Sequence, residues 1–107
     1  MEDKQMENKL YVAYGSNLNL TQMARRCPMA KVVGIGKLKA YQLTFRKVAT
    51  IEQVNGTETP VGVWEITPND ELALDRYEGY PHLYRKEMVT VEMKEGAVEA
   101  MVYIMNN

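Results

Sequence analysis

The sequence contains one cysteine, one histidine, one tryptophan and one phenylalanine among its 107 residues. A single cysteine, Cys27, cannot form an intramolecular disulfide, and with only His82 beside it the chain cannot supply the ligands of a zinc site. No apolar run approaches the length of a membrane span or a signal peptide. We therefore expect a cytoplasmic protein without a metal centre, and we interpret Cys27 as a buried, inert thiol.

Neither sign of charge is in excess, because 13 basic and 14 acidic residues leave a formal net charge of −1. The basic residues are scattered along the chain, so the pattern excludes the basic surface of a nucleic-acid-binding protein. The length fits one domain, which we expect at residues 9–107. Residues 1–8 are mostly charged or amide side chains without periodicity and are expected to be disordered. The pattern does not distinguish a monomer from a homodimer.

The first segment with a clear pattern is a strand that runs into a small polar loop. Aromatic and β-branched residues at positions 11–14 predict the strand, and Gly15 can adopt a positive φ that turns successive backbone N–H groups the same way. Ser16 and Asn17 follow, and a capping-box pattern that begins at Asn19 predicts a helix directly after the loop. Such a loop can hold a carboxylate, a phosphate or an oxyanion, although the same residues are also ordinary in turns.

The rest of the chain reads as short strands and one further helix. Alternating or β-branched residues predict strands at residues 32–37, 41–45, 49–51, 61–66, 84–93 and 98–105. Asn55-Gly56 predicts a turn, and Lys94-Glu95-Gly96 predicts the hairpin loop between the last two strands. Thr67-Pro68 predicts the start of a helix that runs to about Tyr77, with Gly79 placed to end it.

These elements predict an α+β fold. With six or seven short strands and two short helices, we expect a small, mostly antiparallel β-barrel with two or more short flanking helices rather than an open sheet.

One carboxylate has a sequence context that predicts acid/base chemistry. Glu78 lies in the last turn of the second helix, where the negative end of the helix dipole and a like charge on Asp75 both raise a carboxyl pKa. Desolvation among the neighbouring tyrosines acts in the same direction, and a glutamate that titrates near neutrality suits a general acid/base. The alternative is an exposed helix-end glutamate paired to Arg76 or Arg85.

Five short motifs occur in a fixed order. They are Tyr14-Gly15-Ser16-Asn17, the Leu-x-x-Tyr-x-Leu-x-Phe strand of residues 38–45, Val61-Gly62-Val63, Leu74-Asp75-x-x-Glu78-Gly79 and Tyr84-Arg85. In this order and spacing they resemble the γ-glutamylcyclotransferase-like family over residues 9–105. The resemblance implies a compact β-barrel with flanking helices, a substrate-binding loop formed by Tyr14, Gly15, Ser16 and Asn17, and a catalytic Glu78.

The chemistry that the resemblance implies needs no cofactor. The α-amino group of a γ-glutamyl amide attacks its own γ-carbonyl, which gives 5-oxoproline and a free amine, and Glu78 only has to move protons. The loop is expected to face the same cavity as Glu78 and to bind the substrate carboxylate or the oxyanion. Tyr84, and less strongly Tyr103, are candidate substrate-binding hydroxyl donors, although either can equally be a core tyrosine with a satisfied hydroxyl.

Two departures from the family pattern bear on the substrate and on the site. Glutathione-specific relatives carry leucine after Tyr-Gly-Ser, whereas Asn17 resembles the γ-glutamylamine cyclotransferase branch. The chain ends at Asn107, soon after Tyr103, so we expect it to lack closing strands or segments that cover the substrate. Three functions stay open: a γ-glutamyl cyclotransferase, a related enzyme acting on another acyl amide, and a non-catalytic barrel that binds a small carboxylate.

Overall fold

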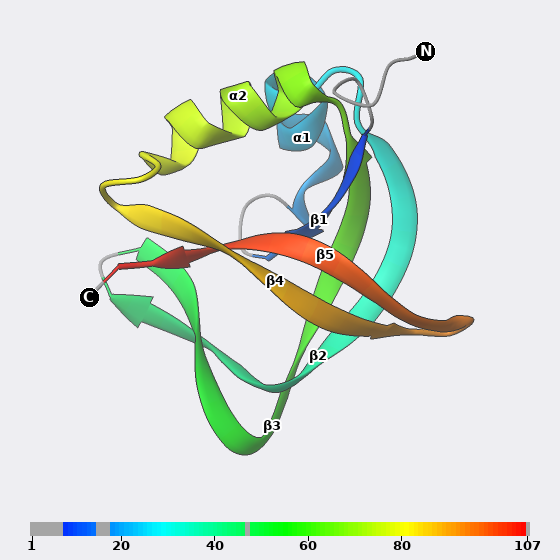
Figure 1. The fold of residues 1–107 in the computed structure, drawn as a ribbon, viewed down its shortest axis with the longest axis vertical. Helices are drawn as coiled ribbons and strands as arrows, with labels where there is room; N and C mark the ends of the chain where they lie inside the picture. The colour runs from blue at the N-terminus through cyan, green and yellow to red at the C-terminus, as the bar shows by residue number, and fades with distance from the viewer. Residues whose placement is uncertain (1–7, 15–17, 47, 107) are drawn as a thin grey trace.

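The structure, a computed structural model, describes residues 8–14, 18–46 and 48–106. Within these residues the chain forms five strands and two helices (Figure 1). In chain order they are β1 (Lys9–Ala13), α1 (Leu20–Arg26), β2 (Lys31–Arg46), β3 (Val48–Ile66), α2 (Pro68–Glu78), β4 (Tyr84–Met93) and β5 (Gly96–Met105). The segment predicted to be disordered, residues 1–8, lies outside the described residues except for its last position.

The five strands form one closed barrel in the order β1-β3-β2-β4-β5. Neighbouring strands are antiparallel, except that β1 and β5 run parallel and meet at the pair Tyr11 and Met101. Both helices lie on one side of the barrel (Figure 1). The predicted α+β class, a small and mostly antiparallel barrel with flanking helices, is confirmed. The expectation that closing strands are missing was wrong, because the described strands already complete the barrel.

The predicted number of strands was wrong because two predicted breaks lie inside continuous strands. Residues 32–37 and 41–45 both belong to β2, which only shifts its register beside Ala40, where φ is 66°. Asn55-Gly56, predicted as a turn, lies inside β3. Antiparallel pairing with β2 continues on both sides of it. The register skips residues 54–57, and Gly56 has φ of 86°, so Asn55-Gly56 forms an irregularity within the strand. This irregular register accompanies the strong bend of β2 and β3 in Figure 1.

The helix ends follow their local signals. The Thr67 side chain accepts a hydrogen bond from the Asp70 N–H, and the Asp70 carboxylate accepts one from the Thr67 N–H, which forms a complete capping box. Gly79 ends α2 in the left-handed conformation with φ of 71°. The Asn19 side chain caps α1, which ends at Cys27. These predictions are confirmed. Neither helix in the described part of the chain combines the length and the apolar content that crossing a membrane requires.

Two sets of buried side chains lie on opposite faces of the strands. The barrel interior consists of Val12, Leu38, Ile51, Val61, Val63, Val89, Val91, Ala100, Val102 and Ile104. The helix-facing layer consists of Tyr11, Ala13, Met23, Cys27, Trp64, Ile66, Leu74, Tyr84, Met101 and Tyr103. Because successive strand residues point to opposite faces, β1, β3, β4 and β5 each contribute to both sets. Adjacent residues on these strands therefore have different roles.

Two hairpins, β2–β3 and β4–β5, meet at a short seam. The predicted β4–β5 hairpin is confirmed, whereas β2 and β4 pair only through Gly36 with Met93 and Lys37 with Glu92. A Cβ atom at Gly36 would lie 2.5 Å from Val91 Cγ1 and 2.9 Å from the Glu92 carbonyl oxygen. The absence of a side chain at Gly36 therefore lets the two strands approach closely enough to pair.

Candidate active site

Glu78 is the last residue of α2, and the chain turns sharply after it. The Gly79 N–H donates to the Arg76 carbonyl at 3.3 Å, and the Tyr80 N–H donates to the Asp75 carbonyl at 2.9 Å. This is the hydrogen-bond pattern of a Schellman motif, which satisfies two of the free carbonyl groups at the helix end. The motif fixes the direction in which the chain leaves α2 towards β4, and with it the position of Glu78.

Burial raises the pKa of Glu78 to about 7, and the nearby Arg26 guanidinium acts in the opposite direction. The predicted direction of the shift is confirmed, but one predicted cause was wrong. Asp75 does not act as a like charge on Glu78, because its carboxylate pairs with Lys86 and accepts a hydrogen bond from Tyr103. The alternative of an exposed Glu78 paired to Arg76 or Arg85 was wrong about exposure, because Glu78 is half-buried, and Arg85 pairs with Glu87 at 2.6 Å.

Two of the predicted site tyrosines lie beside Glu78. Burial raises the pKa of both Tyr14 and Tyr84, and the Glu78 carboxylate raises both further. The Tyr14 hydroxyl donates to the Tyr103 carbonyl at 2.6 Å, and the Tyr84 hydroxyl donates to the Ala49 carbonyl at 2.7 Å. The structure therefore brings together the end of β1, the end of α2 and the start of β4 around one carboxyl group.

Thr50 supports this arrangement from β3. Its side chain is fully buried, hydrogen-bonds with Tyr14 and accepts a hydrogen bond from the Met105 N–H at 2.9 Å. Its bond to Tyr14 lowers the pKa of that phenol and partly offsets the effect of burial. Thr50 therefore connects the Tyr14 side chain to the end of β5.

Tyr103 has a different environment from Tyr14 and Tyr84. Its side chain is 2% exposed, and its hydroxyl donates to Asp75 Oδ1 at 2.6 Å. Its ring makes edge contacts with Tyr11 and Tyr80, at centroid distances of 5.9 and 6.4 Å. Burial and the Asp75 carboxylate both raise the pKa of Tyr103. In this structure the hydroxyl is used to hold α2 on β5 and does not reach Glu78, which favours the core alternative for this residue.

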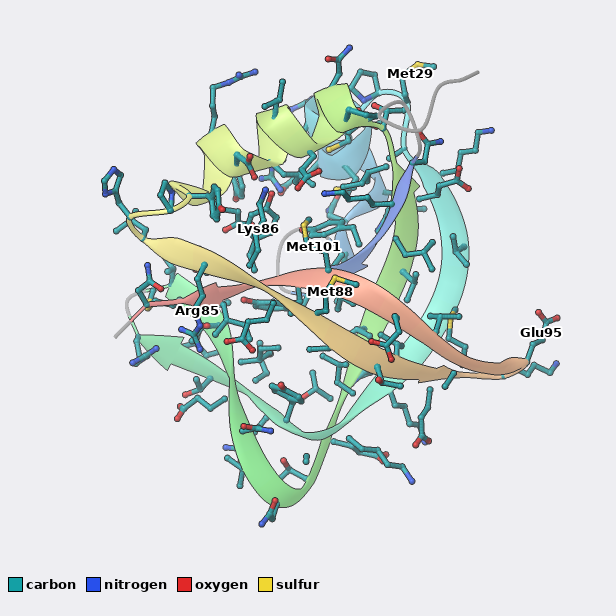
Figure 2. All side chains as sticks on the ribbon, viewed as in Figure 1. Met29, Arg85, Lys86, Met88, Glu95 and Met101 are labelled. Atoms are coloured by element: carbon teal, nitrogen blue, oxygen red, sulfur yellow. The ribbon has the colours of Figure 1, made fainter. Side chains whose placement is uncertain are left out.

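An ion-pair cluster holds the middle of α2 on the barrel. Lys86 Nζ lies 2.6 Å from Glu71 Oε2 and 2.9 Å from Asp75 Oδ1, and Lys9 Nζ lies 3.0 Å from Glu71 Oε1. Figure 2 shows Lys86 between β4 and α2. Burial disfavours the charged amine, but the bonds to Glu71 and Asp75 raise the pKa of Lys86 above its ordinary value. The Lys86 and Lys9 ammonium groups in turn lower the pKa of Glu71, so the charged forms of Lys86 and Glu71 stabilise each other.

Three predicted loop residues, Gly15, Ser16 and Asn17, lie outside the described residues. The residues on either side are described: Tyr14 lies beside Glu78, and Asn19 caps α1. Anion binding by this loop, and a cavity shared with Glu78, stay predictions.

The other reactive side chains do not join the site. Cys27 is buried as predicted, its thiol donates to the Asp70 carbonyl at 3.7 Å, and burial raises its pKa to about 11. His82 is exposed in the turn before β4. In the described ranges no three His, Cys, Asp or Glu side chains gather in a way that could hold a metal ion.

Sequence reasoning missed Arg26, Thr50 and Lys86. Arg26 stacks over the Tyr77 ring at 3.6 Å from its centroid and lies close enough to Glu78 to lower its pKa. Arg26 and Thr50 come from elements distant in sequence from Glu78, and Lys86 lies on the strand after the helix, so no spacing within α2 pointed to them. The one available signal was alternation: Tyr84 and Lys86 share a strand face, so placing Tyr84 near the helix also places Lys86 there.

The sequence also matches known proteins. Residues 11–107 match the family described as "Gamma-glutamyl cyclotransferase, AIG2-like". The chain is 31% identical to the bovine (Bos taurus) γ-glutamylcyclotransferase, with 84% of this chain and 55% of that protein covered. It is 30% identical to the human protein of the same name, with 94% and 61% covered. The chain thus spans a little over half the length of these curated relatives.

The fold matches as well. A solved structure described as a γ-glutamyl cyclotransferase superposes with a TM-score of 0.85 at 30% identity, and the match covers 94% of this chain and 68% of the other. The family match covers every predicted motif and both the end of β1 and the end of α2. The chain therefore belongs to the γ-glutamyl cyclotransferase, AIG2-like family.

Proposed function

We propose that this chain converts γ-glutamyl amides into 5-oxoproline and a free amine or amino acid. The observation that carries the proposal is Glu78, a half-buried carboxyl group whose pKa is raised to about 7 and which lies beside Tyr14 and Tyr84. Such a group is protonated and deprotonated in comparable amounts near neutral pH, which is the condition for an efficient general acid/base. The names of the bovine and human relatives support the same reaction.

In the proposed reaction, Glu78 takes a proton from the substrate α-ammonium group and frees its nitrogen as the nucleophile. That nitrogen forms a bond to the γ-carbonyl carbon, and the original amide C–N bond then breaks. The second proton of the attacking nitrogen and the proton held by Glu78 pass to the departing nitrogen, which leaves as an ammonium group. No net proton is consumed, no protein nucleophile is used, and the proposal requires no cofactor.

The remaining site residues have proposed roles in binding. The Tyr14 and Tyr84 side chains line the position of the reacting amide, and the loop residues Gly15, Ser16 and Asn17 hold the substrate carboxylate or the tetrahedral oxyanion. Asn17 supports a γ-glutamylamine as the substrate. We propose a cytoplasmic location, which fits a small-molecule substrate and a reduced Cys27.

A panel of γ-glutamyl dipeptides and γ-glutamylamines, assayed for 5-oxoproline, tests the reaction and identifies the leaving amine. On the best substrate we expect Glu78→Gln to lower kcat by about 10²- to 10⁴-fold with little change in KM, because the amide keeps the shape but cannot accept the proton. Glu95→Gln, in the β4–β5 turn (Figure 2), is the matched control and should keep full activity. A wild-type chain that forms no 5-oxoproline from any member of the panel would contradict the proposal. So would full activity in Glu78→Gln.

A further inference from the structure

Glu71 and Asp75, which hold α2 on the barrel, lie on the same face of the helix as Glu78. Glu71, Asp75 and Glu78 follow one another at spacings of four and three positions, so their side chains point to the same side. Glu71 and Asp75 both contact Lys86 on β4, and they lie two helical turns and one turn before Glu78. The ion pairs therefore act on the helix face that presents Glu78 to the site.

The Lys86 contacts are short and partly shielded from solvent. The exposed fractions of the side chains are 22% for Lys86, 13% for Glu71 and 20% for Asp75, compared with 58% for Lys9. The Lys86 ammonium also lies 4.2 Å from the centre of the Tyr80 ring, directly after the helix end. Shielded pairs are screened less by salt than exposed pairs, and the loss of one partner leaves the other charged and poorly solvated. Lys86 therefore constrains α2 more strongly than Lys9 does.

The ion-pair cluster is also connected to Tyr14, on the β1 side of the site. Asp75 accepts a hydrogen bond from the Tyr103 hydroxyl, and the Tyr103 carbonyl accepts one from the Tyr14 hydroxyl. A continuous set of contacts thus connects Lys86, Asp75, Tyr103 and Tyr14. Through these contacts α2, which carries Glu78, and the Tyr14 side chain are both held against β5.

We infer that Lys86, acting through Asp75, is a positioning residue that holds the end of α2 against β4 and β5 so that Glu78 stays buried beside Tyr14 and Tyr84. The effect on catalysis rests on the proposed function. The position of Glu78 is a property of the fold and can be tested independently of activity.

Replacing Lys86 separates positioning from simple electrostatics, because the two predict opposite shifts in the Glu78 pKa. Loss of a positive charge near α2 would raise the pKa of Glu78, whereas release of the helix end would hydrate its carboxyl group and lower the pKa. The other groups that face Glu78 are unchanged: Arg26 from α1, Tyr14 after β1 and Tyr84 from β4, with Tyr77 and Arg46 beside Tyr84. The sign of the shift therefore reports which effect dominates.

The experiment is an NMR titration of the Glu78 side-chain carboxyl in the wild type and in Lys86→Met, with kcat and KM measured across pH on the best substrate of the panel. We expect the Glu78 pKa to fall towards its ordinary value and kcat to drop about 10- to 100-fold, with a smaller change in KM. Lys9→Met is the matched control, because it removes a lysine that also pairs with Glu71 but does not touch Asp75. It should leave the pKa and kcat unchanged.

Two further variants guard against an effect of misfolding. Asp75→Asn keeps an acceptor for the Tyr103 hydroxyl but removes the charge that Lys86 contacts, and it should also lower the Glu78 pKa. Loss of the Asp75 charge acts in the same direction, so the sign of the shift in Lys86→Met is the decisive result. Lys86→Arg keeps the charge and should restore most of kcat. An unchanged or raised Glu78 pKa in folded Lys86→Met and Asp75→Asn would overturn the inference. If no substrate is turned over, the proposed function fails, and the titration still decides whether Lys86 positions Glu78.

Discussion

The two faces of the barrel wall differ in chemistry. The barrel interior is built from valine, leucine, isoleucine and alanine side chains, whereas the helix-facing layer contains three tyrosines, a tryptophan, two methionines and a cysteine. Aliphatic contacts are non-directional and depend on packed volume, whereas each buried hydroxyl requires a partner at a defined position. The Tyr84 and Tyr103 hydroxyls have such partners in Ala49 and Asp75.

This difference indicates a division of roles within one thin wall. The interior stabilises the barrel and packs against Tyr14, and the helix-facing layer fixes the positions of α2, Tyr84 and Tyr103. Glu78 lies at the edge of the layer that contains directional contacts. Variants should therefore separate stability from activity according to the face that they change.

The largest expected effect on stability comes from the interior. Leu38 is fully buried there, so Leu38→Ala should lower the free energy of unfolding by about 2–5 kcal/mol through lost burial and a residual cavity. Because Leu38 makes only packing contacts within the interior, kcat per folded molecule should change much less than the free energy of unfolding. Urea unfolding and an activity assay at low denaturant measure the two quantities. A loss of kcat in the folded fraction would break the proposed separation.

Glu78→Gln should have the opposite profile, a loss of activity without a loss of stability. The unfolded chain releases the Glu78 proton near pH 4.5, whereas the folded chain holds it to about pH 7. The stability of the wild type should therefore fall as pH rises from 4.5 to 7, and the ionised carboxyl group opposes folding above that window by on the order of 3 kcal/mol at most. The glutamine variant lacks this loss. Unfolding of both proteins at several pH values measures the difference between their free energies of unfolding. A difference that does not grow with pH would contradict the raised pKa.

Thr50→Val sharpens the comparison, because it changes a hydrogen bond and conserves shape. The variant leaves the half-buried Met105 N–H without its acceptor and should cost about 1–3 kcal/mol. Its neighbour Ile51 faces the interior, and Ile51→Val should cost about 0.5–1.5 kcal/mol through packing alone. We expect Thr50→Val, which removes a hydrogen bond to Tyr14, to alter the environment of Tyr14 more than Ile51→Val does, and the fluorescence or NMR signals of that ring would report the difference. Equal responses from the two variants would show that the faces are not distinct.

The smallest effect on stability is expected for a residue that belongs neither to the barrel interior nor to the helix-facing layer. Met88 and Met101 pair directly across β4 and β5, but Met88 is 64% exposed and Met101 is 4% exposed. Met88→Ala should change stability by less than about 0.5 kcal/mol, whereas Met101→Ala should cost several times more. Figure 2 shows the two side chains together on the outer side of these strands. Thermal unfolding of both variants provides the test, and a large effect at Met88 would indicate that its surface is covered in solution.

Local signals in the sequence predicted the helices, the last hairpin and the fold class. Thr67 and Gly79 set the ends of α2 through contacts within a few residues, so their sequence context was sufficient. Asn55-Gly56 does adopt a local positive-φ conformation at Gly56, but it does not end the strand, because pairing with β2 resumes on both sides. The raised pKa of Glu78 was predicted in direction, but its main cause, burial, depends on residues that only the folded barrel brings together. Lys86 was missed for the same reason.

The short seams of the barrel have a consequence for the order of folding. Within each hairpin the paired residues are close in sequence, whereas the β1–β5 contact joins residues near opposite ends of the chain through one pair, and the β2–β4 seam has two pairs. Local pairs form early and the distant closure late, because closing a long loop costs entropy before its contacts form. Tyr14, Glu78 and Tyr84 come from segments that only closure unites. In a refolding experiment, amide protection should therefore return first in the two hairpins, and 5-oxoproline formation should return last.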